Sequence, residues 1–472
     1  MAERSAATGI PRVVIAGVAS GVGKTTVTVA VARALRARGL RVAAFKCGPD
    51  YLDPTYHARA IDGPCHNLDG WMMGRDVVRT TFARAARGAD VALVEGVMGL
   101  YDGASPTGES GSTAEIAKWL DAPVLLTVDA GGMARSIAAV VAGFAGFDRA
   151  VSLAGAIANC VGSRGHLDLL RMALPSPPIL GGLPRDAEHA FPERHLGLRM
   201  ADERSLPTAW LDHWGALAEA WFALDAILDV ARSSPAWVVD EALAPTPVAR
   251  RCRVGIARDE AFHFYYEDNL RRLEALGAEL VPFSPLKDDA LPEVDGLYLG
   301  GGYPELHAAA LAANTSMREA VARFARGGGP VYAECGGLMY LTRAIITGDG
   351  REHPMVGLLP GAARMCGTLQ ALGYVEVETK SRTILGPAGT RFRGHQFRYS
   401  ELSPAPTLEE VDHAYSLGRR RGDTTLQEGY RVQNVLASYV HAHWASNPGV
   451  AAALVESCVR NRAPGSRGGG AR

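Results

Sequence analysis

Two short stretches of the sequence carry residues whose types and spacing can do chemistry. Residues 331–337 read VYAECGG, so Cys335 follows an apolar run and precedes two glycines. Residues 17–26 read GVASGVGKTT, a glycine-rich segment that ends in lysine and threonines. A thiol between a strand and a helix is typical of a nucleophile on a sharp turn. A glycine-rich loop of the second kind holds phosphate groups with its backbone N–H groups.

The phosphate loop lies between an apolar run and a helical stretch, which is the context that such a loop requires. We expect Lys24 on the outer phosphates and Thr25 on Mg²⁺, with the helix N-terminus facing the phosphates. The spacing differs from the plain Walker pattern, because Val18 stands where that pattern has glycine. A glycine-rich turn that contains GKTT by chance is the alternative, and the sequence context disfavours it. The predicted ATP-binding residues of the loop are Gly21, Gly23, Lys24, Thr25 and Thr26.

Acidic residues follow two expected strands, at the sheet edge where α/β proteins bind ligands. KCGPDYLDP (46–54) and VEGVMGLYDG (94–103) are the two stretches. Carboxylate oxygens are ligands that Mg²⁺ prefers. Each acid alone is more often a solvated loop residue or a helix cap, but several acids beside a phosphate loop favour a metal or substrate site. The predicted metal and substrate residues are Asp50, Tyr51, Asp53, Glu95 and Asp102.

Asn159 ends another expected strand of the first half of the chain. It is a candidate for contacting the edge of adenine in bound ATP. An ordinary turn residue is an equally good interpretation of an asparagine at this place.

The thiol has candidate partners elsewhere in the second half. The N–H groups of Gly336 and Gly302 are predicted to form an oxyanion hole. In SYVHAHW (438–444), His441 or His443 can act as the base that deprotonates Cys335. These partners favour a nucleophile over an ordinary buried thiol, and the absence of any CxxC pair argues against zinc. Four other cysteines are expected to be buried and inert: Cys47, Cys160, Cys252 and Cys458.

The elements that position these residues form two successive series of apolar runs and helices. Continuous Val/Ile/Leu runs are typical of parallel strands covered on both faces, so the first series predicts a doubly wound α/β domain and the second series another α/β domain. A helix is expected from Thr26 to Arg38, ended by Gly39. The Pro- and Ala-rich stretch 233–251 is interpreted as a linker, with a boundary near residue 245. The expected strands span 12–17, 41–47, 90–97, 122–130, 154–160 and 178–184, then 251–259, 278–285, 295–305 and 329–337.

Length and composition restrict the class of protein. A chain of 472 residues is too long for one ordinary core. A net charge of −1 gives no field for nucleic acid or an anionic membrane surface. No apolar run is long enough to span a membrane, and the start lacks a signal-peptide core. Scattered cysteines indicate reduced thiols, so the cytoplasm is the expected compartment. The tail from Arg462 is expected to be disordered.

With both motifs placed, the chain resembles the cobyrinic acid a,c-diamide synthase family over roughly residues 10–446. The spacing of the phosphate loop resembles that of dethiobiotin synthetase, whereas partition-type ATPases carry a second lysine where Ala19 stands. The resemblance implies a P-loop ligase domain (1–245), a linker (246–252), a class I glutamine amidotransferase domain (253–446), and a C-terminal helix with a disordered tail (447–472). The stretches that carry it are GVASGVGKTT, KCGPDYLDPTYH, HNLDGWM, VEGVMGLYDG, GGGYPEL, YAECGGLMYL and SYVHAHW.

The resemblance implies a glutamine-hydrolysing carbon–nitrogen ligase that amidates two carboxylates of cobyrinic or hydrogenobyrinic acid in cobalamin biosynthesis. Its small-molecule substrates would be the corrinoid polycarboxylate, glutamine and ATP, with Mg²⁺ as cofactor. Nickel-sirohydrochlorin a,c-diamide synthase, cobyric acid synthase and a cell-wall amidating ligase are related alternatives. A nucleotide-switched binding protein is an alternative of another class. The sequence leaves the oligomeric state open, and a homodimer is one state that it allows.

Two departures from the family pattern concern the thiol site. The usual His-x-Glu has His443 at the glutamate position, so a dyad of Cys335 and His441 is expected. A neutral partner should raise the pKa of His441 less than a carboxylate would. The other departure is GHQFRYS (394–400), in which Gln396 and Arg398 stand where relatives usually have glutamate and histidine. The role of this stretch is left open by the sequence.

Overall fold

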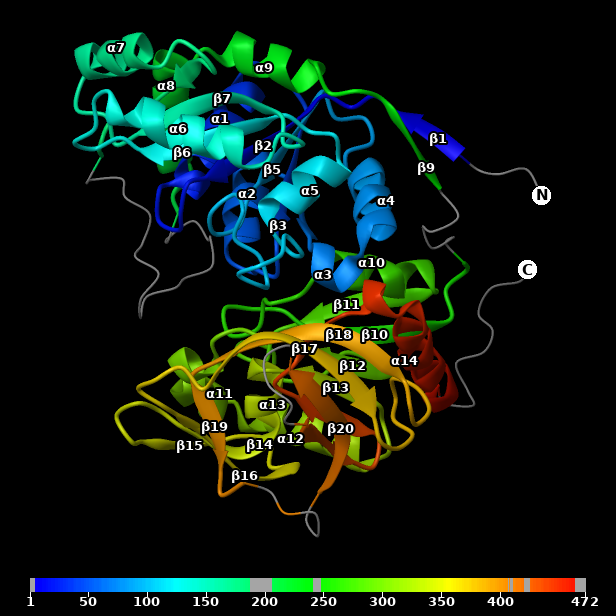
Figure 1. The fold of residues 1–472 in the computed structure, drawn as a ribbon. Coiled ribbons are helices and arrows are strands. Elements are labelled where there is room, and N and C mark those ends of the chain that lie inside the picture. The colour runs from blue at the N-terminus through cyan, green and yellow to red at the C-terminus, as the bar shows by residue number, and fades with distance from the viewer. Residues whose placement is uncertain are drawn as a thin grey trace. The chain divides into compact units, whose positions relative to one another are not determined.

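A computed structural model describes residues 5–186, 206–240, 248–405, 407, 411–419 and 425–462. The chain divides into two compact units, Met1–Ala244 and Pro245–Arg472 (Figure 1). The expected disordered tail beyond Arg462 and residues 241–247 of the expected linker lie outside the described residues. Within the described ranges, no helix has the length and apolar content needed to cross a membrane.

The first unit is built on a parallel sheet of seven strands in the order β4-β3-β5-β2-β6-β7-β8. Every strand expected in this half is present, which confirms the doubly wound α/β class. β4 was not expected, because its sequence CHNL is short and half polar. The strands are β2 (Arg12–Gly17), β3 (Val42–Cys47), β4 (Cys65–Leu68), β5 (Val91–Glu95), β6 (Val124–Asp129), β7 (Leu153–Asn159) and β8 (Ile179–Gly181).

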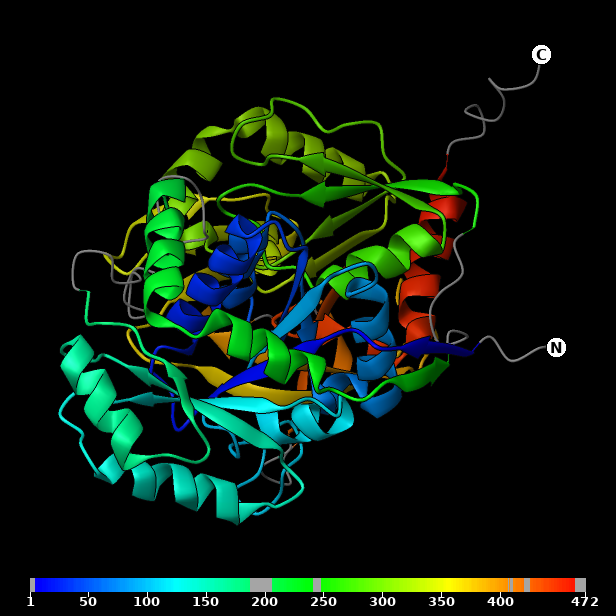
Figure 2. The ribbon, with the colours of Figure 1, turned by 90° about the horizontal axis from the view of Figure 1, so that it is seen from above.

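Helices cover this sheet and form its core. The first helix, α1 (Lys24–Ala37), ends next to Gly39 (φ +84°) as expected and lies beside α8 (Thr208–Trp221) (Figure 2). Together with α2 (Asp53–Ile61) and α9 (Leu224–Arg232), these helices bury the apolar face of the central strands. The other helices are α3 (Gly70–Met73), α4 (Arg75–Ala85), α5 (Thr113–Trp119), α6 (Ser136–Phe147) and α7 (Arg164–Ala173).

Part of the expected linker is instead a strand of the first unit. β9 (Trp237–Asp240) pairs antiparallel with β1 (Ser5–Thr8). Trp237 is buried, its indole N–H donates to the Leu120 carbonyl at 3.0 Å, and the Arg79 guanidinium lies 4.3 Å from its ring centroid. A buried aromatic side chain therefore anchors a segment whose Pro and Ala content indicated only a linker.

The second unit contains a mixed sheet of ten strands in the order β11-β10-β12-β13-β22-β21-β20-β17-β18-β23. The strands from β11 to β22 in this order are parallel, as expected, and the antiparallel remainder was not expected. The strands are β10 (Cys252–Ala257), β11 (Ala278–Phe283), β12 (Gly296–Leu299), β13 (Val331–Glu334), β17 (Ala371–Thr379), β18 (Arg391–Arg398), β20 (Asp412–Arg419), β21 (Thr425–Val432), β22 (Val435–Ser438) and β23 (His441–His443).

A smaller sheet and several helices complete the second unit. The smaller sheet has the order β15-β14-β16-β19, formed by Glu352–Pro354, Thr342–Ile346, Leu359–Met365 and Ser400–Ser403. The helices are α10 (Glu267–Ala275), α11 (Ala308–Ala313), α12 (Thr315–Arg326), α13 (Gly336–Leu341) and α14 (Pro448–Asn461), with short 3₁₀ turns η2 (Pro304–His307) and η3 (Trp444–Ser446).

The stretch SYVHAHW is divided between two strands. β22 ends at Ser438 beside β13, and β23 begins at His441 beside β18, so the chain leaves the middle of the sheet for its edge. Glu428 accepts hydrogen bonds from the Ser438 hydroxyl (2.5 Å) and the Tyr439 N–H (2.6 Å). The buried Glu428 carboxylate thus accepts hydrogen bonds from the polar groups between the two strands.

Candidate active sites

The phosphate loop joins β2 to α1 and is held by a side chain from β7. Gly23 has φ +89°, and a Cβ there would come within 2.0 Å of the Asn159 amide nitrogen, so only glycine fits. That nitrogen donates to the Val22 carbonyl at 3.0 Å. Lys24 is buried and its Nζ donates to the Ala19 carbonyl at 3.0 Å. Asn159 therefore supports the loop, and its contact with adenine stays a prediction.

A buried ion cluster lies at the carboxyl ends of β3 and β5. Lys46 Nζ is 2.7 Å from Asp53 Oδ2 and 2.8 Å from Glu95 Oε1, and all three side chains are almost fully buried. Burial would raise the pKa of Glu95, but Lys46 and His57 hold it well below its usual range. Burial would likewise lower the pKa of Lys46, but Asp53 and Glu95 raise it. Lys46 and Glu95 are therefore both charged at neutral pH.

Glu95 connects this cluster to the phosphate loop. The Thr25 hydroxyl donates to Glu95 Oε1 at 2.8 Å, and His57 Nε2 contacts the other carboxylate oxygen. His57 is fully buried, and its Nδ1 has no hydrogen-bond partner among the described residues. Three elements, α1, β3 and α2, thus meet at one carboxylate.

Lys46 and His57 were not among the predicted site residues. A signal for Lys46 was its position in the apolar run VAAFKC, because a lysine in a buried strand requires paired charges. A signal for His57 was its spacing four residues after Asp53, which places both on one helix face.

The other predicted acids hold turns, although the charge of Asp50 also helps to raise the pKa of Lys46. Asp50 Oδ1 accepts from the N–H groups of Leu52 (2.7 Å) and Asp53 (3.1 Å), so it holds the turn before α2, where Tyr51 is also buried. The exposed Asp102 accepts from the Gly99 N–H at 2.9 Å, within its own loop. The structure therefore brings Asp53 and Glu95 together, and Asp50 and Asp102 hold loop turns.

Oxygen donors that suit Mg²⁺ are present at the loop. Thr25 Oγ1 and Glu95 Oε1 lie 2.8 Å apart. Among the described residues, no group of three or more His, Cys, Asp or Glu side chains is arranged around a common metal position. Mg²⁺ at phosphoryl-transfer sites commonly takes one or two carboxylates together with the phosphates, rather than an all-protein cage. The residues present fit that mode of binding.

Cys335 lies on a strained turn between β13 and α13. Its φ of +48° and ψ of −102° are rare for a residue with a side chain, and such strain is typical of a nucleophile elbow. Its N–H donates to the Ser438 carbonyl at 2.7 Å. A Cβ at Gly336 would lie 3.1 Å from the Gly302 nitrogen, so the two predicted oxyanion donors are neighbours.

His441 borders the same glycine turn. A Cβ at Gly301 would lie 2.5 Å from His441 Cε1. Burial lowers the pKa of His441 to about 3, and burial, with Glu305 nearby, raises the pKa of Cys335 to about 12. Burial thus disfavours the charged form of His441, which has no carboxylate partner in the position of His443. The resting pair is a neutral thiol and a neutral imidazole.

His443 does not replace the missing carboxylate. Its Nδ1 accepts from the Ala445 N–H at 3.4 Å, and its Nε2 has no hydrogen-bond partner in the described part of the chain. Burial lowers the pKa of His443 to about 4, against the opposing effect of Asp268. Three of the four cysteines expected to be buried are buried. Cys160 is only half-buried, because it follows the carboxyl end of β7, where its φ is +58°.

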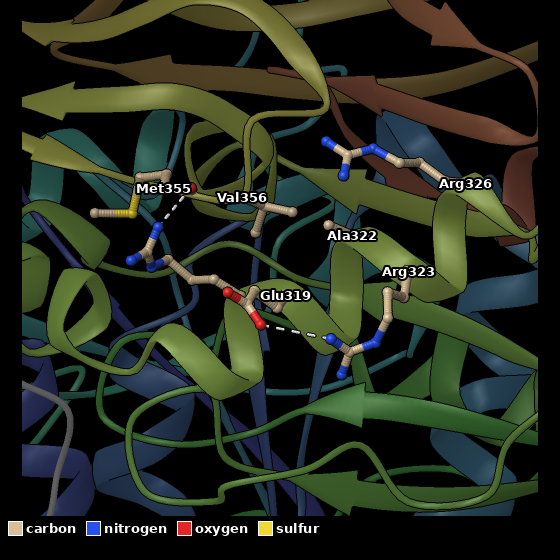
Figure 3. A pocket seen from close by; sticks show the side chains of 7 residues that line it. Glu319, Ala322, Arg323, Arg326, Met355 and Val356 are labelled. Atoms are coloured by element: carbon tan, nitrogen blue, oxygen red, sulfur yellow. Dashed lines mark hydrogen bonds and ion pairs between the residues drawn. The ribbon is translucent and has the colours of Figure 1, made fainter.

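Figure 3 shows a separate hollow of about 360 Å³ on the second unit, beside α12. Arg318 donates there to the Met355 carbonyl at 3.1 Å, and Arg323 pairs with Glu319 at 3.5 Å (Figure 3). None of the predicted site residues lines it. Arg318 and Arg323 are engaged with protein groups, and we assign the chemistry to the thiol turn and the phosphate loop.

Comparisons with known proteins identify a nucleotide-binding domain and a glutamine amidotransferase domain. Residues 13–198 match the CobQ/CobB/MinD/ParA nucleotide binding domain, and residues 253–449 match the CobB/CobQ-like glutamine amidotransferase domain. The chain is 51% identical to a cobyrinate a,c-diamide synthase of Leptospira interrogans, over 96% of this chain and 99% of that protein. A Syntrophotalea carbinolica protein of the same name is 51% identical (95% and 98%). A hydrogenobyrinate a,c-diamide synthase of Streptomyces coelicolor is 42% identical (97% and 99%).

Proposed function

The chain belongs to the cobyrinate a,c-diamide synthase family, and we propose that it amidates the a and c carboxylates of cobyrinate or hydrogenobyrinate with ATP and glutamine. One observation carries the proposal: a phosphate loop tied to a buried Lys–Asp–Glu–His cluster and a strained thiol beside a histidine occur in one chain. We assign the ligase chemistry to residues 1–245 and glutamine hydrolysis to residues 253–446. The free thiols of its cysteines suit the cytoplasm.

The first unit would convert the carboxylate into an electrophile. A carboxylate does not react with ammonia at neutral pH, because oxide is a poor leaving group. Transfer of the γ-phosphoryl group of ATP gives an acyl phosphate, from which ammonia displaces phosphate. Lys24 would neutralise charge on the transferred group. Thr25 and Glu95 would hold Mg²⁺, which supplies further positive charge at the phosphates when bound.

The buried cluster has a separate role in this proposal. Lys46 would hold the carboxylates of Asp53 and Glu95 in place at the strand ends, close to the phosphate loop. Asp53 and Glu95 keep that lysine protonated despite its burial. His57 would hold Glu95 in the orientation that reaches Thr25.

The second unit would produce ammonia from glutamine. His441 takes the proton from Cys335 Sγ, and the thiolate attacks the side-chain amide carbon. The N–H groups of Gly336 and Gly302 stabilise the oxyanion that forms. His441 then returns the proton to the leaving nitrogen, ammonia departs, and water hydrolyses the glutamyl thioester to glutamate and free thiol.

Incubation with substrates and mass spectrometry tests the proposal. The protein is mixed with ATP, Mg²⁺, glutamine and either cobyrinic or hydrogenobyrinic acid. We expect two successive conversions of a carboxylate to an amide, together with glutamate and ADP. A parallel reaction with nickel sirohydrochlorin tests whether the protein is instead a nickel-sirohydrochlorin a,c-diamide synthase. ATP- and glutamine-dependent conversion of none of the three tetrapyrroles by folded protein would overturn the assignment.

A further inference from the structure

The stretch GHQFRYS supplies His395, whose ring packs on His441, the proposed base of the thiol site. β18 and β23 pair antiparallel, with His395 directly opposite His441. Their ring centroids are 5.0 Å apart and the ring planes differ by 18°, so the rings are stacked. Both side chains are buried, with 7% and 2% of their surface exposed. A stacked partner therefore lies on the ring face of His441.

The ring of His395 is fixed from a second element. The Tyr266 hydroxyl and His395 Nδ1 are 2.9 Å apart, and Tyr266 is buried at the start of α10. In the same helix, Asn269 donates to the Ala442 carbonyl at 2.8 Å and accepts from the Trp444 N–H at 2.9 Å. α10 thus holds both the strand that carries His441 and the ring that stacks on it.

His395 is neutral in this environment. Burial, with the neighbouring His441 and His443, lowers the pKa of His395 well below its usual value. A neutral aromatic ring attracts a cation placed over its face. When His441 takes the thiol proton it becomes such a cation, in a site that excludes water.

We propose that His395, held by Tyr266, is a positioning residue for His441: it fixes the plane of the base and stabilises the imidazolium formed when Cys335 is deprotonated. No bond is made or broken at His395, and the proton stays on His441 until it passes to the leaving nitrogen. The inference rests on the proposed glutamine hydrolysis at Cys335. It assigns a role to the stretch that the sequence left open.

Replacement by residues with and without a flat ring tests this role. His395→Phe keeps a ring over His441, whereas His395→Leu keeps apolar volume without one. We expect His395→Leu to lower kcat for glutamate release about 3- to 30-fold, the range of a cation over an aromatic face. The KM for glutamine should stay within about 2-fold, because His395 acts on the base and not on substrate binding. His395→Phe should keep kcat within about 3-fold of wild type.

Two controls separate positioning from damage to the fold. His413→Leu removes another histidine of the second unit, packed on Tyr430 at 5.3 Å, and should leave kcat unchanged. Amidation with ammonium salt, which bypasses Cys335, should be unchanged in every variant. If His395→Leu fails to fold, His395→Gln keeps a polar partner for Tyr266 without a ring, and the same fall in kcat is expected.

The outcomes distinguish this inference from the function on which it rests. Equal losses in His395→Phe and the ringless variant, or an unchanged kcat in the ringless variant, would overturn the role of His395 while glutamine hydrolysis by the wild type stands. A wild-type protein that releases no glutamate would overturn the proposed function itself. A rise in KM with unchanged kcat would assign His395 to substrate binding and also overturn the inference.

Discussion

Lys46→Met should destabilise the first unit strongly, because it removes the cation of a buried cluster. Lys46 Nζ lies 2.7 Å from Asp53 and 2.8 Å from Glu95, with each side chain at most 3% exposed. Removing one partner of a buried ion pair costs about 3–5 kcal/mol, since the remaining charge stays out of water. For a unit of this size, that loss lowers the unfolding midpoint by roughly 6–20 °C.

The loss of stability in Lys46→Met should be larger at neutral pH than at acid pH. In the wild type the pKa of Glu95 is lowered from 4.5, so the carboxylate stabilises the folded state above that pH and the contribution fades as pH falls further. In Lys46→Met, burial is no longer offset by Lys46, so the pKa of Glu95 rises and the ionised form costs stability above the unfolded value. The difference between variant and wild type is therefore largest at pH 7–8, and it shrinks as pH approaches about 4.

Tryptophan fluorescence during thermal or urea unfolding measures this loss selectively. All tryptophans except Trp444 lie in the first unit. Arg41→Met is the matched control, because it breaks an exposed ion pair with Asp90 at the start of the same strand and should change the midpoint little. Glu95→Gln added to Lys46→Met should recover much of the loss. A midpoint for Lys46→Met equal to that of Arg41→Met, or a deficit that grows at acid pH, would refute the reasoning.

Three further predictions concern activity. Cys335→Ala should abolish amidation with glutamine and retain it with high ammonium salt, and equal loss of both activities in a folded variant would contradict the nucleophile assignment. Lys24→Ala should abolish amidation with either nitrogen source, because no acyl phosphate forms, and wild-type product formation at saturating ATP and Mg²⁺ would refute this. His441→Ala should cut glutamate release by roughly 10²-fold or more, the scale of a lost general base. His443→Ala should cost clearly less, since its Nδ1 contacts Ala445, and a larger loss at His443 would reverse the assignment.

The parallel strands were predictable because burial on both faces leaves a continuous apolar run, as in RVVIAG of β2. The antiparallel half of the second sheet leaves no such run: β18 reads RFRGHQFR, with charged residues at both ends. β9 is anchored by Trp237, which packs on residues far away in the sequence, so the local pattern does not indicate a strand. The fold class was thus encoded in local patterns, and the edge strands were not.

The same distinction applies to the candidate sites. Lys24, Glu95 and Cys335 stand at the ends of recognisable strands, so the topology alone brings them to the right edge. Lys46 and Glu95 are 49 residues apart, and His395 and His441 meet only through pairing of β18 with β23. Nothing local in GHQFRYS indicates which residue will face that histidine. Residues that tune a site are therefore harder to predict than residues that define it.

The two sites treat charge in opposite ways, and the proposed reaction explains why. Phosphoryl transfer needs a carboxylate ready for Mg²⁺ before the nucleotide reacts, and Lys46 and His57 hold the pKa of Glu95 low despite its burial. Glutamine hydrolysis needs a thiolate only while glutamine is bound. With the pKa of Cys335 near 12 and that of His441 near 3, the resting thiol is almost wholly protonated and unreactive.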